Sequence, residues 1–111
     1  MKIDQSEIQG VKLLTIEGEV DLNSSPQLRE VFCGLIAKGE TKFIVDFKSV
    51  SYVDSSGLAT LIEMVQRLKK NQGTVSLIQL SDKVRNLFEI TKLDKLFKIY
   101  NTQEEAMAAA E

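Results

Sequence analysis

Two kinds of hydrophobic spacing alternate along this chain of 111 residues, and the alternation limits the folds open to it. In residues 26–38 and 55–72, apolar side chains recur every three or four positions, which is the spacing of one helix face. The two stripes are Leu28, Val31, Phe32, Leu35 and Ile36, and then Leu58, Leu61, Ile62, Val65 and Leu68. Each stripe predicts an amphipathic helix with one buried face.

Short apolar runs before, between and after these helices predict strands. Residues 2–8 and 11–19 indicate an opening hairpin with its turn at Gln9-Gly10. Further strands are predicted at residues 43–47, 74–80 and 97–100. Two more helices are predicted from their capping residues, one after Ser81 or Asp82 and one at a Thr102–Glu105 capping box.

The predicted order of elements is therefore β-β-α-β-α-β-α-β-α. Strands joined by helices pair in parallel through right-handed crossovers, whereas the opening hairpin is antiparallel. We therefore expect an α/β fold with a central mixed β-sheet and four α-helices, formed by a single domain over residues 1–111.

Composition removes several functional classes. The chain has no histidine, so it lacks the usual general base and the commonest zinc ligand. Its one cysteine, Cys33, lies in an apolar helix pattern and is expected in the core, without a disulfide or a metal site. Scattered basic residues and a net charge of −2 argue against nucleic-acid binding. With no apolar stretch long enough to cross a bilayer and no signal peptide, we expect a cytoplasmic protein without membrane insertion.

The segment from Ser51 to Leu58 lies between a predicted strand and a predicted helix. Asp54 or Ser55 can serve simply as the helix N-cap, and physical chemistry alone favours that role. The same position also suits a phosphoacceptor, because a phosphate on Ser55 would meet the positive end of the helix dipole. Phosphorylation would add about −1.5 to −2 charges to an exposed surface without unfolding the domain. The two roles are compatible.

Longer motifs resemble those of a known family. They are Gly18-Glu19-Val20-Asp21, Val50 to Leu58 with its Asp-Ser-Ser-Gly-Leu signature, Val84 to Phe88 and Leu93 to Ile99. Together they resemble the anti-sigma factor antagonists of the STAS superfamily over nearly the whole chain. The resemblance implies the STAS fold, phosphorylation at Ser55, and a partner that is both an anti-sigma factor and a serine kinase. It also implies a PP2C-type phosphatase, a monomer when free, and a chain that is a substrate and not an enzyme. No cofactor is expected, since the sequence has no glycine-rich phosphate loop.

Five further residues are candidates for the partner-binding surface. Asp21 either contacts the kinase or repels a new phosphate, or it serves only in a turn. Asp54 orients the Ser55 hydroxyl or caps the helix, and capping is favoured. Ser56 is a second possible acceptor that the family pattern disfavours, and Gly57 either admits a partner's backbone or serves packing. Met64, together with Ala59, is expected to point away from the buried stripe and extend the surface.

Two alternatives remain open. The chain could be a STAS interaction module in another assembly, such as a signalling complex or a lipid-transport accessory subunit, without sigma factor control. Asp46, which follows a buried strand, suggests a receiver-type phosphoacceptor aspartate. That chemistry needs an acidic cluster for magnesium, and no paired carboxylates are found at the first strand. A catalytic role is therefore disfavoured.

Overall fold

The computed structural model describes residues 1–110, whose elements follow the predicted order with one additional short 3-10 helix. The elements are β1 (Lys2–Ile8), β2 (Val11–Val20), α1 (Ser25–Ala37), β3 (Lys42–Val53), α2 (Ser55–Lys70), β4 (Thr74–Ile78), α3 (Asp82–Ile90), the 3-10 helix η1 (Leu93–Lys95), β5 (Lys98–Tyr100) and α4 (Gln103–Ala110). The predicted α/β fold is confirmed.

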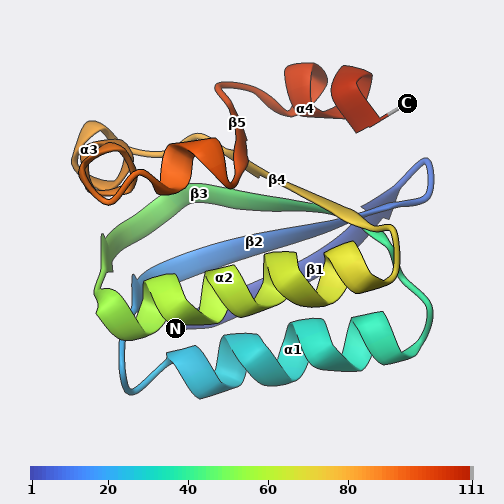
Figure 1. The fold of residues 1–111 in the computed structure, drawn as a ribbon, viewed down its shortest axis with the longest axis horizontal. Coiled ribbons are helices and arrows are strands. Elements are labelled where there is room, and N and C mark those ends of the chain that lie inside the picture. The colour runs from blue at the N-terminus through green and yellow to red at the C-terminus, as the bar shows by residue number, and fades with distance from the viewer. Residues whose placement is uncertain (111) are drawn as a thin grey trace.

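All five strands form one mixed sheet in the order β1-β2-β3-β4-β5. β1 pairs antiparallel with β2, and the remaining neighbours are parallel. The turn between β1 and β2 places Gln9 and Gly10 at φ values of 52° and 82°, the left-handed conformations that a tight hairpin turn requires. Figure 1 shows this turn at the opposite end of the sheet from the start of α2.

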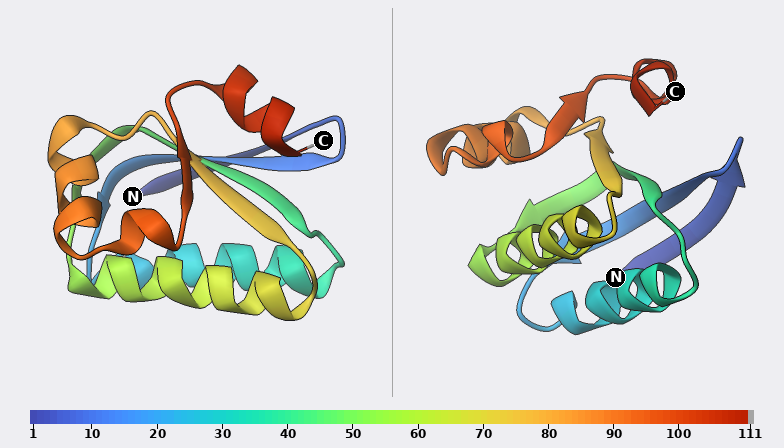
Figure 2. Two further views of the ribbon diagram at one scale, coloured as in Figure 1. Left: turned by 45° about the horizontal axis from the view of Figure 1, so that its top comes forward. Right: turned by 45° about the vertical axis from the view of Figure 1, so that its right-hand side comes forward.

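Helices cover the two faces of the sheet unequally. α1 and α2 lie side by side on one face, and α4 lies on the other, as Figures 1 and 2 both show. The larger core fills the space under α1 and α2 and extends to α3, whereas a small cluster of Val11, Ile44, Ile78 and Ala106 lies beneath α4. Cys33, predicted in the core, is only partly buried and packs at its border.

β3 is longer than predicted because its spacing changes after Phe47. The pairing of β3 with β2 has two irregularities, between Thr15 and Glu17 and between Gly18 and Glu19 of β2. At each one β3 contributes an extra residue, as in a β-bulge. Inward-facing side chains on β3 therefore recur every third residue, at Phe47, Val50 and Val53, and the strand continues to the start of α2.

Two polar contacts stabilise this framework. The carboxylate of Asp46 accepts a hydrogen bond from the backbone N–H of Lys48 at 2.9 Å, next to the first irregularity. On the helical face, the guanidinium of Arg29 in α1 donates to the carboxylate of Glu63 in α2 at 2.9 Å. Hydrogen bonds from Arg29 and Arg67 lower the pKa of Glu63 from its ordinary value.

α3 is held against the sheet by aromatic packing. The ring of Phe88 meets the ring of Phe47 edge-on at 6.4 Å and the ring of Phe97 at 5.5 Å. All three side chains are buried. Such edge-to-face pairs stabilise beyond the area they bury, so they fix the position of α3 beside the end of β3. Of the two predicted caps of α3, Ser81 and Asp82, the structure selects Ser81, since its hydroxyl accepts from the N–H of Val84.

Candidate functional site

Ser55 is the first residue of α2, and its side chain is exposed. Asp54, immediately before it, is the N-cap. The carboxylate of Asp54 accepts from the N–H of Gly57, and its carbonyl oxygen accepts from the N–H of Leu58. Of the two capping residues that the sequence left open, the structure selects Asp54. The Ser55 hydroxyl is therefore free of a capping role and faces solvent at the positive end of a helix of 16 residues.

The Asp54 carboxylate also holds a second segment. Its Oδ1 atom lies 2.9 Å from the Gly57 nitrogen, and its Oδ2 atom lies 3.1 Å from the nitrogen of Leu22. Leu22 belongs to the loop between β2 and α1. Because β2 and β3 are parallel, their carboxyl ends meet at one edge of the sheet, where Asp54 links the two connections that leave it.

Asp21 organises the same loop. Its Oδ1 atom accepts hydrogen bonds from the backbone N–H groups of Asn23 and Ser24, both at 3.0 Å. The Ser24 hydroxyl is within 3.1 Å of that oxygen and 2.6 Å of the carbonyl oxygen of Glu19. Hydrogen bonds, chiefly the one from the Ser24 backbone, lower the pKa of Asp21 below its ordinary value. Its side chain thus serves in a turn, one of its two predicted roles.

Ser56 and Gly57 differ from Ser55 in exposure. Ser56 is partly buried, and its carbonyl accepts from the hydroxyl of Thr60. Gly57 is buried, and a Cβ atom placed on it would lie 2.3 Å from the carbonyl oxygen of Val20. The packing explanation for Gly57 therefore applies, because β2 and α2 approach too closely there for any side chain.

The prediction that Met64 points away from the core is wrong. Met64 is 0% exposed and belongs to the main core cluster. Its position is three residues after Leu61 and four before Leu68, so it lies at the centre of the buried face of α2. Ile62, which the sequence placed in the stripe, is the partly exposed one, and Ala59 is exposed as predicted.

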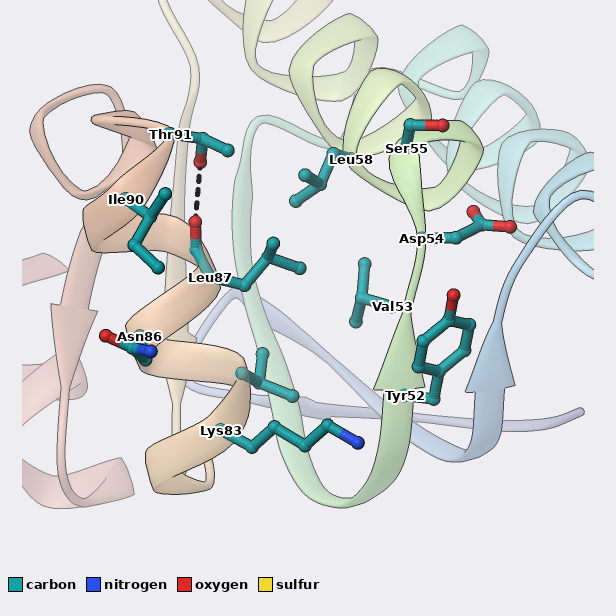
Figure 3. Close-up of a pocket in the computed structure, with 11 residues that line it drawn as sticks. Tyr52, Val53, Asp54, Ser55, Leu58, Lys83, Asn86, Leu87, Ile90 and Thr91 are labelled. Carbon is teal, nitrogen blue, oxygen red and sulfur yellow. Dashed lines mark hydrogen bonds between the residues drawn. The ribbon is translucent and has the colours of Figure 1, made fainter.

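A groove lies between the β3–α2 junction and α3 (Figure 3). Its volume is about 570 Å³, and Ser55 is among its lining residues. Tyr52 and Ile90 also line it, with 43% and 71% of their surfaces exposed. The sequence analysis did not identify these two residues. The exposure of Ile90 could have been predicted from the sequence, because Ile90 falls outside the apolar stripe of α3 formed by Val84, Leu87 and Phe88.

The described part of the chain gives little support for a metal site, a phosphoacceptor aspartate or a membrane-spanning helix. Among residues 1–110, no three His, Cys, Asp or Glu side chains are grouped so as to hold a metal ion. The carboxylate of Asp46 is engaged by the Lys48 backbone and, at 3.3 Å, by the side-chain amide of Gln79. Within the same residues, no helix combines the length and apolar character needed to span a membrane.

Comparison with known proteins gives a consistent result. The model of the family described as the STAS domain matches residues 2–106. The anti-sigma-B factor antagonist of Staphylococcus aureus is 32% identical over 84 residues, which cover 76% of this chain and 78% of that protein. BtrV of Bordetella bronchiseptica is 29% identical over 109 residues, covering 98% of this chain and 94% of that protein.

Solved structures share the fold. The phosphorylated form of the Bacillus cell fate determinant SpoIIAA superimposes with a TM-score of 0.77 at 23% identity, covering 99% of this chain and all of that one. A sulfate transporter family protein from Wolinella succinogenes superimposes with a TM-score of 0.80 at 20% identity, over 93% of this chain and 86% of that one. The fold is therefore shared by a cell fate determinant and a sulfate transporter family protein.

Proposed function

Since this chain belongs to the STAS domain family, we propose that it is an anti-sigma factor antagonist switched by phosphorylation of Ser55. In the unphosphorylated form it binds an anti-sigma factor that is also a serine kinase, and the sigma factor is released. The kinase phosphorylates Ser55 and binding is lost. A PP2C-type phosphatase restores the active form, and all of these events belong to the cytoplasm.

The observation that carries this proposal is the position of Ser55. Its hydroxyl is exposed at the first residue of α2, where Asp54 has already satisfied the Gly57 N–H. The N–H groups of Ser55 and Ser56 have no acceptor among residues 1–110. A phosphate on Ser55 is stabilised by those groups and by the helix dipole. The domain can therefore carry the modification without unfolding.

The same phosphate would weaken the binding of this chain to its partner. It places about −1.5 to −2 charges at the groove that Tyr52 and Ile90 line, and near the Leu22 backbone, which bonds to the adjacent Asp54. Leu22, Tyr52 and Ile90 are the large apolar side chains that are most exposed within residues 1–110. Burying that charge against a partner costs free energy unless cations pair with it. In the transfer step, the Ser55 oxygen attacks the γ-phosphorus of ATP, ADP leaves, and the hydroxyl proton passes to a base of the kinase. This chain is a substrate and supplies only the nucleophile.

The test uses the purified kinase-type anti-sigma factor encoded by the same genome. With ATP and Mg²⁺, intact-mass measurement should show one added phosphate on the wild type and on Ser56→Ala, and none on Ser55→Ala. Ser56→Ala is the matched control because it removes the neighbouring hydroxyl of the same helix turn. Phosphate on Ser55→Ala, or equally tight kinase binding by Ser55→Asp and wild type, contradicts the proposal.

A second candidate is supported by the transporter likeness. The same fold in a sulfate transporter family protein makes an interaction module of another assembly, such as a signalling complex or a lipid-transport accessory subunit, the alternative function. The two differ in what the unphosphorylated chain captures from its own cytosol. An anti-sigma factor of the kinase type supports the first proposal, and transporter subunits support the second.

A further inference from the structure

The groove beside Ser55 has an apolar floor. Figure 3 shows side chains from both of its walls directed into it. Those that line it include Val53, Leu58, Val84 and Leu87. The aromatic packing of Phe88 against Phe47 fixes the α3 wall, so the groove is built into the fold and does not depend on a loop.

Two large side chains at this groove are exposed to an unusual degree. Ile90 is 71% exposed and Tyr52 is 43% exposed. Covering such surface gains about 25 cal/mol for each Å² of apolar area removed from water. Within residues 1–110, the only other large apolar side chain as exposed is Leu22, whose N–H is bonded to Asp54 next to Ser55. An exposed apolar cluster of this kind is typical of an interaction surface.

One basic side chain, that of Lys83, lines the same groove. The ammonium of Lys83 lies 5.9 Å from the centre of the Tyr52 ring, within the range of a cation–π contact. No carboxylate among residues 1–110 forms a salt bridge with Lys83, whereas Lys2, Lys12, Arg29 and Arg67 each have one. Figure 3 shows Lys83 and Tyr52 together, with Ser55 farther along the groove. Asp54 also lines the groove, but its two carboxylate oxygens accept from the N–H groups of Gly57 and Leu22. The end of the groove at Lys83 is therefore complementary to an acid.

We infer that the groove between the start of α2 and α3 receives an apolar side chain of the anti-sigma factor, flanked by a carboxylate that pairs with Lys83. This inference rests on the proposed function and specifies its docking surface. It also supplies a reason for the switch, because Ser55 lines the groove. A phosphate there repels the partner's carboxylate and adds a strongly hydrated group to an apolar contact.

The test is the dissociation constant for the purified kinase-type anti-sigma factor of the same genome, measured by calorimetry. Ile90→Ala should weaken binding about tenfold, the loss typical of a central apolar anchor. Lys83→Glu should weaken it by a similar factor, and Lys83→Arg should stay within about threefold of wild type. Both positions are exposed, so the variants should unfold at the wild-type urea concentration.

Lys38→Glu is the matched charge control. Lys38 is exposed and follows the C-terminal end of α1, which Figure 1 shows away from the start of α2. Its variant should bind as wild type does. If wild type binds and both Ile90→Ala and Lys83→Glu bind within about twofold of it, the groove inference is overturned while the proposed function stands. If wild type itself does not bind the kinase, the proposed function is overturned, and the inference with it.

Discussion

The Oδ2 atom of Asp54 accepts a hydrogen bond from the backbone N–H of Leu22 at 3.1 Å, across a separation of 32 residues. The other carboxylate oxygen caps α2 through Gly57. One side chain thus fixes both the helix that presents Ser55 and the loop that presents Leu22. The loop that carries the exposed Leu22 and the proposed phosphoacceptor Ser55 are consequently held in a fixed relation to each other.

Replacing Asp54 should separate its two contacts. Asp54→Ala should lower the free energy of unfolding by about 1 kcal/mol, the usual cost of losing an N-cap. Asp54→Asn retains an acceptor for the Gly57 N–H but replaces the Oδ2 acceptor of the Leu22 N–H with an NH2 group, so it should keep the cap, lose the loop contact and cost less than Asp54→Ala. Urea unfolding measures both values. Amide exchange at Leu22 should accelerate in Asp54→Ala; unchanged exchange there would show that the loop is held by other contacts.

Two glycines should respond oppositely to alanine. At Gly57 the new Cβ would meet the Val20 carbonyl oxygen at 2.3 Å, so Gly57→Ala should destabilise by about 1–3 kcal/mol. At Gly34 in the middle of α1, nothing lies within 4 Å of the new Cβ. Gly34→Ala should therefore stabilise by about 0.5–1 kcal/mol. Thermal unfolding of both variants checks the signs, and a stable Gly57→Ala protein would contradict the close packing of α2 on β2.

Met64 should behave as a core residue and not as part of the binding surface. Met64→Ala should cost about 2–5 kcal/mol of unfolding free energy, because a fully buried side chain leaves a cavity. Met64→Leu nearly conserves volume and should cost less than about 1.5 kcal/mol. The Leu variant should also bind the kinase with wild-type affinity. Weakened binding by a folded Met64→Leu protein would return Met64 to the partner surface.

Acid should destabilise the fold partly through Asp21. Hydrogen bonds lower its pKa in the folded state from the ordinary value of 3.8. The folded chain thus binds fewer protons, and this contribution to stability is present above that value and is lost as the pH falls through the lowered pKa. Asp21→Asn should therefore flatten the dependence of stability on pH below about 4.

Urea unfolding across the acid range measures that slope. Asp94→Asn is the control, since Asp94 is exposed and its carboxylate accepts no hydrogen bond within residues 1–110. If the two variants show the same slope, the network around Asp21 does not persist in solution. The pKa of Glu63 is lowered too, so part of the acid sensitivity should remain in Asp21→Asn.

The sequence predicted much of the fold because most elements have strong local signals. The hairpin turn at Gln9-Gly10, the helix after Ser81 and the capping of α4 by Thr102 all follow from the conformational preferences of those residues. The second half of β3, after Phe47, was not predicted because it has no such local signal. Its two extra residues change the spacing of buried side chains from two to three, and no local preference marks that change.

The site was predicted unevenly for a related reason. Asp54 and Ser55 are adjacent in sequence, so their capping geometry is local. The groove joins Tyr52 of β3 with Ile90 of α3, and only the tertiary packing of α3 brings them together. Met64 was misplaced because the buried face of α2 is wide enough to include a position between two stripe residues.

The hairpin turn at Gln9-Gly10 is a suitable place to attach a label. It lies at the opposite end of the sheet from the start of α2, where Ser55 is located (Figure 1). A fluorophore or an immobilisation tag introduced there would report on complex formation without obstructing it. A label at the tip of β1 and β2 would thus allow the proposed association with a partner to be followed in real time.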